Sequence, residues 1–254
     1  MRHEFLNAPI WLIGVIVTAL MILAAEIGYH IGRRNTACDS GVGAVKASIL
    51  ALVGLLLAFS YSIAAGHYDR RKQVVVEEAK SLKTCWLRTD LVAEPARSRA
   101  RELLRSLVEA RLMSHDRAAD PKAEQRFLAH QLELWALAYG QLHQSSEPDK
   151  HVLLVQSVND VIDRGGERAA AAEHRVPMPV MYLLIASILV SGFLIGLSSG
   201  QDQRRIPLLW AIVIILMVGV LTIIFDLDNP GRGLIPDWTK PLDDVKAIIG
   251  GVGR

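Results

Sequence analysis

Residues 46–72 read KASILALVGLLLAFSYSIAAGHYDRRK, and this stretch decides the fold. From Lys46 to Ala65 the chain is almost entirely apolar for about twenty residues, which is the length that a helix needs to cross ~30 Å of hydrocarbon. The run from His67 to Lys72 then changes abruptly to charged residues, as expected where a helix leaves the membrane for water. We therefore predict a transmembrane helix that ends near Ala65.

Three further apolar blocks have the length of membrane spans, and they cover Pro9–Ile31, Val180–Gly200 and Pro207–Phe225. The first block is longer than the apolar core of a signal peptide and is followed by no small-residue cleavage site, so we interpret it as a retained span. The link between the last two blocks is so short that they must form an antiparallel hairpin. The sequence thus predicts two spans near each end of the chain.

Between the two pairs of spans the sequence shows the pattern of water-soluble helices. Val75, Ala79, Leu82 and Trp86 step by four, three and four residues, so the second span continues into solvent as one long helix. No segment alternates with period two, so no strand is predicted. The predicted fold class is all-α: a polytopic membrane protein with four transmembrane helices and a central helical cytosolic segment. The predicted boundaries are 1–65 for the first pair of spans, 66–176 for the cytosolic segment, 177–226 for the hairpin, and 227–254 for a C-terminal tail with a short helix from Leu242 to Ile249.

The topology follows from the number of spans. Four spans place the N-terminus, the central segment and the C-terminus on the same side of the membrane. Near the spans, that side carries about eleven Lys and Arg residues against about five on the other side, which favours a cytoplasmic central segment.

Several classes of function are disfavoured by the composition. A formal net charge of +2 gives no field that would attract nucleic acid. The two cysteines, Cys38 and Cys85, fall on opposite sides of the second span and cannot easily pair. Since His-Glu-x-x-His, Cys-x-x-Cys and Gly-x-Ser-x-Gly motifs are missing from the sequence, we expect no catalytic residues, no metal and no cofactor.

Six segments of the sequence carry a resemblance to a known family. They are Glu26-Ile27-Gly28-Tyr29-His30-Ile31-Gly32-Arg33-Arg34, Gly54-Leu55-Leu56-Leu57-Ala58-Phe59-Ser60, Tyr68-Asp69-Arg70-Arg71 with Val75-Val76-Glu77-Glu78-Ala79, Leu87-Arg88-Thr89-Asp90-Leu91, and Phe225-Asp226-Leu227-Asp228-Asn229-Pro230-Gly231-Arg232-Gly233-Leu234-Ile235. Together they resemble a bacterial membrane family of unknown function that is labelled bestrophin-like and is distantly similar to bestrophins.

This resemblance implies a function as well as a fold. Bestrophins are pentameric anion channels whose second span lines the pore. The resemblance therefore implies a homo-oligomeric channel, a pentamer if the likeness extends so far, that passes small inorganic ions such as chloride across a bacterial inner membrane. Its other partner would be the lipid bilayer, and both termini would be cytoplasmic. No long acidic run corresponding to a calcium clasp is found, so calcium gating is not implied. The alternative is a non-conducting, membrane-anchored helical platform that recruits a signalling partner.

The candidate pore-lining residues lie on one flank of the second span. They are Leu55, Phe59, Ser62 and Ile63. Arranged around a symmetry axis, they would form an apolar neck with hydroxyl groups at its lower mouth, and such constrictions can gate by dewetting. The alternative is that these residues pack on neighbouring spans.

An intramembrane polar pair, Glu26 and His30, shares one face of the first span. Ionisable residues inside a bilayer are costly and suggest ion handling, whereas a structural role near the outer interface would pair Glu26 with Arg33 or Arg34. The pair is a candidate on either interpretation.

Two further groups of charged residues are candidates. Arg70, Arg71, Glu77, Glu78 and Arg88 follow the second span, where the basic members either attract anions to a cytosolic mouth or pair with Glu77, Glu78 and Asp90 along the helix. An acidic turn after the last span contains Asp226 and Asp228. With Asp237 these residues have the offsets of first, third and twelfth calcium ligands, but capping a turn or binding Arg70, Arg71 or Arg88 explains them more simply.

Overall fold

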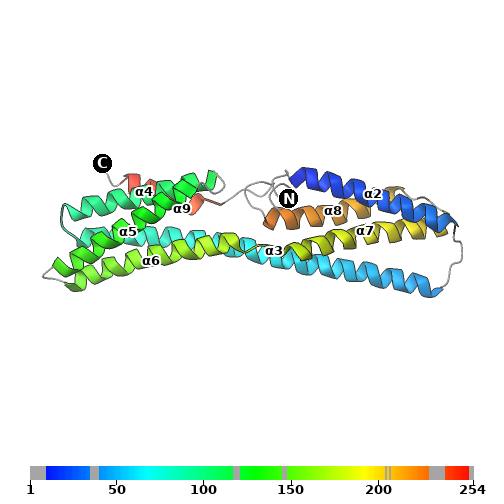
Figure 1. The fold of residues 1–254 in the computed structure, drawn as a ribbon, viewed down its shortest axis with the longest axis horizontal. Helices are drawn as coiled ribbons and strands as arrows, with labels where there is room; N and C mark the ends of the chain where they lie inside the picture. Colours follow the sequence, from blue (N-terminus) through cyan, green and yellow to red (C-terminus); the bar gives the residue numbers. More distant parts are fainter. Residues whose placement is uncertain are drawn as a thin grey trace. The chain divides into compact units, whose positions relative to one another are not determined.

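A computed structural model describes residues 10–34, 40–116, 121–144, 148–203, 205, 207–228 and 238–251. Over these residues the chain is helical and contains no strand, and the predicted all-α class is confirmed (Figure 1). The helices are α2 (Ile10–Arg34), α3 (Ser40–Arg88), the 3₁₀ turn η1 (Thr89–Leu91), α4 (Ala96–Asp116), α5 (Pro121–Gln144), α6 (Pro148–Glu173), α7 (Met178–Gln201), α8 (Pro207–Asp228) and α9 (Lys240–Gly251).

The chain forms two compact units. The first, which we call the membrane unit, comprises residues 1–68 and 175–237, and the second, the helical unit, comprises residues 69–174 and 238–254. Helix α3 contributes to both, because its 49 residues run without interruption from the second span into the helical unit. The prediction of one long helix through this region is therefore confirmed.

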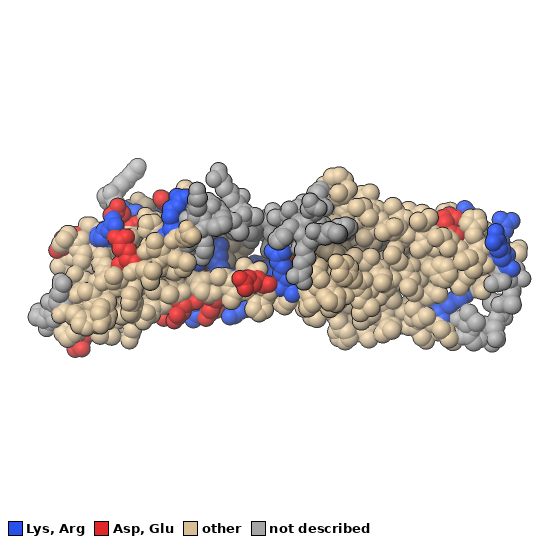
Figure 2. Space-filling model, in the orientation of Figure 1, with Lys and Arg blue, Asp and Glu red and all other residues tan. Residues whose placement is uncertain are grey.

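Within the part of the chain that the structure describes, four helices are long and apolar enough to cross a membrane, as predicted. They are α2, the first half of α3, α7 and α8. The visible surface of the membrane unit carries few Lys, Arg, Asp or Glu side chains except near its ends (Figure 2). Such a charge-poor band suits the contact of transmembrane helices with hydrocarbon.

Helices α2 and α7 lie in backbone contact. A Cβ atom on Gly196 would lie 1.9 Å from the carbonyl oxygen of Ala25, and one on Gly28 would lie 2.1 Å from that of Phe193. Gly200 meets Tyr29 in the same way, at 2.3 Å. Since the contact positions rise together along both helices, α2 and α7 run parallel. Small residues at such a seam are the usual means of close helix packing in membranes.

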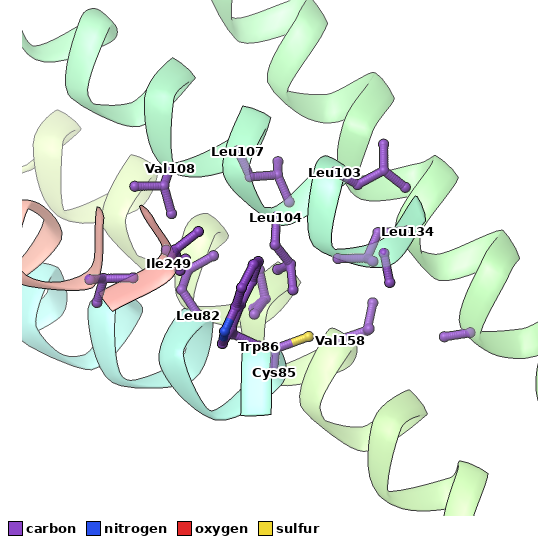
Figure 3. Close-up of a cluster of buried hydrophobic side chains, with 14 of the residues drawn as sticks. Leu82, Cys85, Trp86, Leu103, Leu104, Leu107, Val108, Leu134, Val158 and Ile249 are labelled. Atoms are coloured by element: carbon purple, nitrogen blue, oxygen red, sulfur yellow. The ribbon is translucent and has the colours of Figure 1, made fainter. Parts of the chain in front are cut away.

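The helical unit has its own hydrophobic core, centred on Trp86 of α3 (Figure 3). The indole is 2% exposed, and α4, α5 and α6 pack around it. Figure 3 shows Ile249 of α9 among these side chains. Leu242 and Val245 of α9 are buried as well, so the final helix, predicted only as part of a tail, belongs to this core.

Candidate pore-lining face and its flanking charges

The membrane part of α3 packs on the rest of its unit through one face. Val53, Leu57, Ser60 and Ala64 are all at most 5% exposed and step by four, three and four residues. Val53, Leu57 and Ala64 belong to the core of the membrane unit together with residues of α2, α7 and α8. This face fixes the rotation of the helix and so decides which side chains point away from the chain.

All four candidate pore-lining residues point away from this packed face. Leu55, Phe59 and Ile63 are 51%, 59% and 49% exposed, and Ser62 is exposed as well. Within a single chain, these side chains are therefore left largely uncovered by the neighbouring spans. Large apolar side chains on such a surface must meet lipid, another protein surface or a pore.

A second exposed flank of α3 consists of small residues. Its members recur at steps of four, three and four: Ala47, Ala51, Gly54 and Ala58. No atom lies within 4 Å of a Cβ built on Gly54. The exposed residues of α8, by contrast, are mostly large and apolar, such as Ile215 at 69% and Leu216 at 63%. The membrane part of α3 thus has a packed face, a large apolar flank and a small-residue flank.

The polar pair on α2 has a partner that the sequence did not identify. Arg205 donates to Glu26 Oε2 at 2.9 Å, and its guanidinium lies 4.2 Å from the ring centroid of Tyr29. His30 Nε2 lies 4.0 Å from the same carboxylate oxygen. The expected pairing with Arg33 or Arg34 is wrong, because the short loop between α7 and α8 carries Arg205 to this end of the unit.

The charges after the second span pair mainly with α6. Arg70 lies 3.8 Å from Glu167, and Glu77 accepts a hydrogen bond from Arg164 at 2.9 Å. Arg71 Nη1 contacts the carbonyl of His174 at 3.4 Å, and Arg88 donates to that of Leu153 at 2.8 Å. Arg70 and Arg88 thus have partners on α6, because α6 lies alongside this part of α3. Asp90, another candidate partner in the sequence, pairs with Arg97 and Arg101.

Glu78 does not lie among exposed charges, as it would at the cytosolic mouth of a pore. It is 1% exposed, and its two carboxylate oxygens accept hydrogen bonds from Arg111 at 2.8 Å and Arg168 at 2.6 Å. The guanidinium of Arg111 also stacks 3.6 Å from the ring centroid of Phe127. A charge in the core is tolerated only when it is paired and hydrogen-bonded in this way. We therefore assign Glu78 to the structure of the helical unit.

The sequence held a signal for this buried network. Arg111 follows Leu107 by four residues and so occupies a position on the apolar stripe of α4, where a charge is unexpected. Glu78 likewise lies four residues from both Val74 and Leu82 on the buried face of α3. Two opposite charges on the inner stripes of two helices predict a buried ion pair between them.

Asp226 and Asp228 do not lie in a turn after the last span, where the sequence predicted them. Both lie in the last turn of α8, at 3% and 5% exposure, so the helix continues beyond Phe225. Asp228 Oδ1 accepts a hydrogen bond from the backbone N–H of Val176 at 2.8 Å, just before α7 begins. Residues 229–237, including Asp237 of the calcium-ligand pattern, lie outside the described residues.

Four candidate membrane-crossing helices and a helical unit outside them define a polytopic helical membrane protein. The chain belongs to the Bestrophin-like family, whose domain model matches residues 8–235. The resemblance found in the sequence is thereby confirmed. No curated protein shows significant sequence similarity to the chain.

Solved structures share the fold. A single-substitution variant of a bacterial bestrophin homologue from Klebsiella pneumoniae matches with a TM-score of 0.74 at 12% identity, over 93% of this chain and 98% of that chain. The same homologue in another crystal structure gives 0.65 at 14% identity, over 94% and 96%. A protein described only as a membrane protein gives 0.74 at 14% identity, over 94% and 97%. At these identities the likeness establishes the fold alone.

Proposed function

We propose that this protein is a homo-oligomeric ion channel that passes small anions across the bacterial inner membrane, with α3 lining the path. The observation that carries the proposal is the uncovered flank of α3 with Leu55, Phe59 and Ile63, in a chain that belongs to the Bestrophin-like family. In a ring of copies this flank faces the symmetry axis and forms an apolar neck. Such a neck controls conduction through its radius and its wetting.

The small-residue flank of α3 supports the ring. Ala47, Ala51, Gly54 and Ala58 would let a helix of the neighbouring copy approach α3 closely, as glycines do between α2 and α7 in the same chain. The large apolar residues exposed on α8 instead suit contact with lipid. A pentamer, as in bestrophins, is the arrangement that we propose.

Positive charge at one end of the membrane unit supports a preference for anions. Arg33 and Arg34 are exposed there, and Lys46 lies nearby, hydrogen-bonded to Gln201 at 2.5 Å. Arg205 is exposed at this end as well, but it pairs with Glu26. Basic residues around a pore entrance raise the local concentration of anions. At the start of the helical unit, by contrast, Arg70 and Arg164 pair with Glu167 and Glu77, so that region adds little net charge. The central segment and both termini lie in the cytoplasm in this proposal.

The test is ion flux from liposomes that contain the purified protein. The wild type should release chloride, Phe59→Ala should change the rate by widening the neck, and Leu55→Glu should suppress chloride by placing a negative charge there. The matched control is Leu216→Ala, which removes a similarly exposed side chain from α8 and should leave the flux unchanged.

Two results would contradict the proposal. Equal chloride flux through the wild type and both α3 variants would show that α3 does not line the ion path. The absence of ion flux through a folded, oligomeric wild type would favour the alternative of a non-conducting helical platform. Reversal potentials in unequal chloride and sodium solutions would separate an anion channel from a cation channel.

A further inference from the structure

One face of α2 is exposed over much of its length. Leu20, Leu23, Ile27 and Ile31 are 41%, 56%, 48% and 43% exposed, and they step by three, four and four residues. This spacing places them on one side of the helix, and we call the four residues the α2 stripe. The opposite side of the helix is occupied, because it forms the seam with α7.

Arg34 lies at the end of the α2 stripe. It follows Ile31 by three residues and Ile27 by seven, so it shares their side of the helix, and its side chain is exposed. Arg34 and the adjacent Arg33 form no hydrogen bond or ion pair with any residue that the structure describes. The described part of the chain therefore supplies no anionic partner for the guanidinium that ends this stripe.

Two other basic residues at this end of the membrane unit are already bound. Lys46 Nζ donates a hydrogen bond to Gln201 Oε1 at 2.5 Å. Arg205 donates to Glu26 and lies over the ring of Tyr29. Arg205 comes just before the exposed apolar residues of α8, but it is not available to a further anion. The α2 stripe thus differs from the exposed face of α8 by ending in an unpaired guanidinium.

We propose that the α2 stripe and Arg34 bind an anionic phospholipid, with its acyl chains along the stripe and its phosphate on the guanidinium. An apolar surface that ends in a positive charge suits an amphiphile with an anionic head, and arginine binds phosphate through two parallel hydrogen bonds. From Leu20 to Arg34 the helix rises about 21 Å at 1.5 Å per residue, which exceeds the ~15 Å of hydrocarbon in one leaflet. The stripe is therefore long enough to contact the acyl chains over their whole depth.

The inference does not depend on ion conduction. It requires only that α2 crosses a bilayer, and it concerns a different helix from the one that carries Leu55 and Phe59. Adjacent residues on a helix point about 100° apart, so Arg33 faces away from the α2 stripe. Arg33 therefore remains available to anions at the entrance considered above, and it offers a matched control for Arg34.

Native mass spectrometry of the purified full-length protein in detergent tests the proposal, with phosphatidylglycerol as the anionic lipid and phosphatidylcholine as the zwitterionic one. The wild type should retain phosphatidylglycerol in preference to phosphatidylcholine. Arg34→Gln should weaken this retention about tenfold, the expected effect of losing a hydrogen bond between charged groups. Arg33→Gln removes an exposed, unpaired guanidinium outside the stripe and should leave the retention unchanged. Excess glycerol phosphate, which has the phosphate without the acyl chains, should not displace the lipid.

Four outcomes would overturn the proposal. Equal retention of the two lipids by the wild type, or equal losses in the two variants, would show that Arg34 makes no specific contact with a lipid phosphate. Displacement by glycerol phosphate would indicate a site for soluble anions. A smaller oligomer for Arg34→Gln than for the wild type, in the same spectra, would indicate that the stripe faces another copy of the chain. Because ion flux is not the readout, none of these outcomes decides whether the protein conducts.

Discussion

Glycine residues set the distance between α2 and α7. At Gly196 the space for a side chain is occupied by the backbone of Ala25, which cannot move as a flexible side chain could. We expect Gly196→Ala to separate the two helices and to lower the free energy of unfolding by about 3 kcal/mol, the upper part of the usual range for overpacking. Thermal unfolding in detergent measures the effect. Gly219→Ala on α8, where no atom lies within 4 Å of the added Cβ, should change stability little.

The adjacent residues Glu77 and Glu78 allow a buried ion pair to be compared with a surface one. Glu78→Gln leaves Arg111 and Arg168 without their shared carboxylate in the core, and we expect a loss of roughly 3–5 kcal/mol. Glu77→Gln breaks the partly exposed pair with Arg164, for which a much smaller loss is expected. Thermal unfolding of both variants gives the comparison. Equal losses would contradict the assignment of Glu78 to the core.

The thiol of Cys85 provides a test through pH. Burial raises the pKa of this thiol from 9.0 to about 11, and Cys85 lies in the helical unit, beyond the membrane part of α3. In a Cys38→Ser background, labelling by a maleimide at pH 8 should therefore be at least roughly a hundredfold slower in the folded than in the denatured protein. Between pH 9 and 11 the folded state binds more protons at this group than the unfolded state, so stability should fall as the pH rises through that range. Labelling at the same rate with and without denaturant would show that the thiol is accessible.

At the scale of elements, α9 behaves as part of the helical unit. Ile249 is 3% exposed within the core around Trp86, and Arg105 Nη2 contacts its carbonyl oxygen at 3.4 Å. We expect Ile249→Ala to lower the free energy of unfolding by about 2–5 kcal/mol and to make α9 sensitive to protease before the rest of the chain. The matched control is Lys246→Ala, an exposed position on the same helix. Limited proteolysis followed by mass determination distinguishes the two variants.

At the scale of the whole molecule, the sequence predicted the helices better than their contacts. Spans and the long helix α3 depend on local hydropathy and on spacing within one segment, which the sequence carries directly. The partner of Glu26 depends on which loop returns to the same end of the membrane unit, and Arg205 comes from a segment 179 residues away. The burial of Asp226 and of α9 depends in the same way on packing between distant segments. Only the charged residues on inner stripes, such as Arg111, offered a local sign of such a contact.

The parallel seam of α2 and α7 constrains the topology of the whole chain. Because both helices cross in the same direction, their C-terminal ends lie on one side of the membrane. We propose that the helical unit lies on the other side. We propose that the helical unit is cytoplasmic, so in a Cys38→Ser background a membrane-impermeant maleimide should label Asp202→Cys, in the turn after α7, in cells whose outer membrane alone is permeabilised. Lys83→Cys, exposed on α3, should be labelled only after the inner membrane is opened. The reverse labelling pattern would show that the protein has the opposite orientation in the membrane. The basic residues near Arg205 would then lie at the cytoplasmic entrance. Labelling of both positions in intact inner membranes would contradict four crossings, and with them the common direction of α2 and α7.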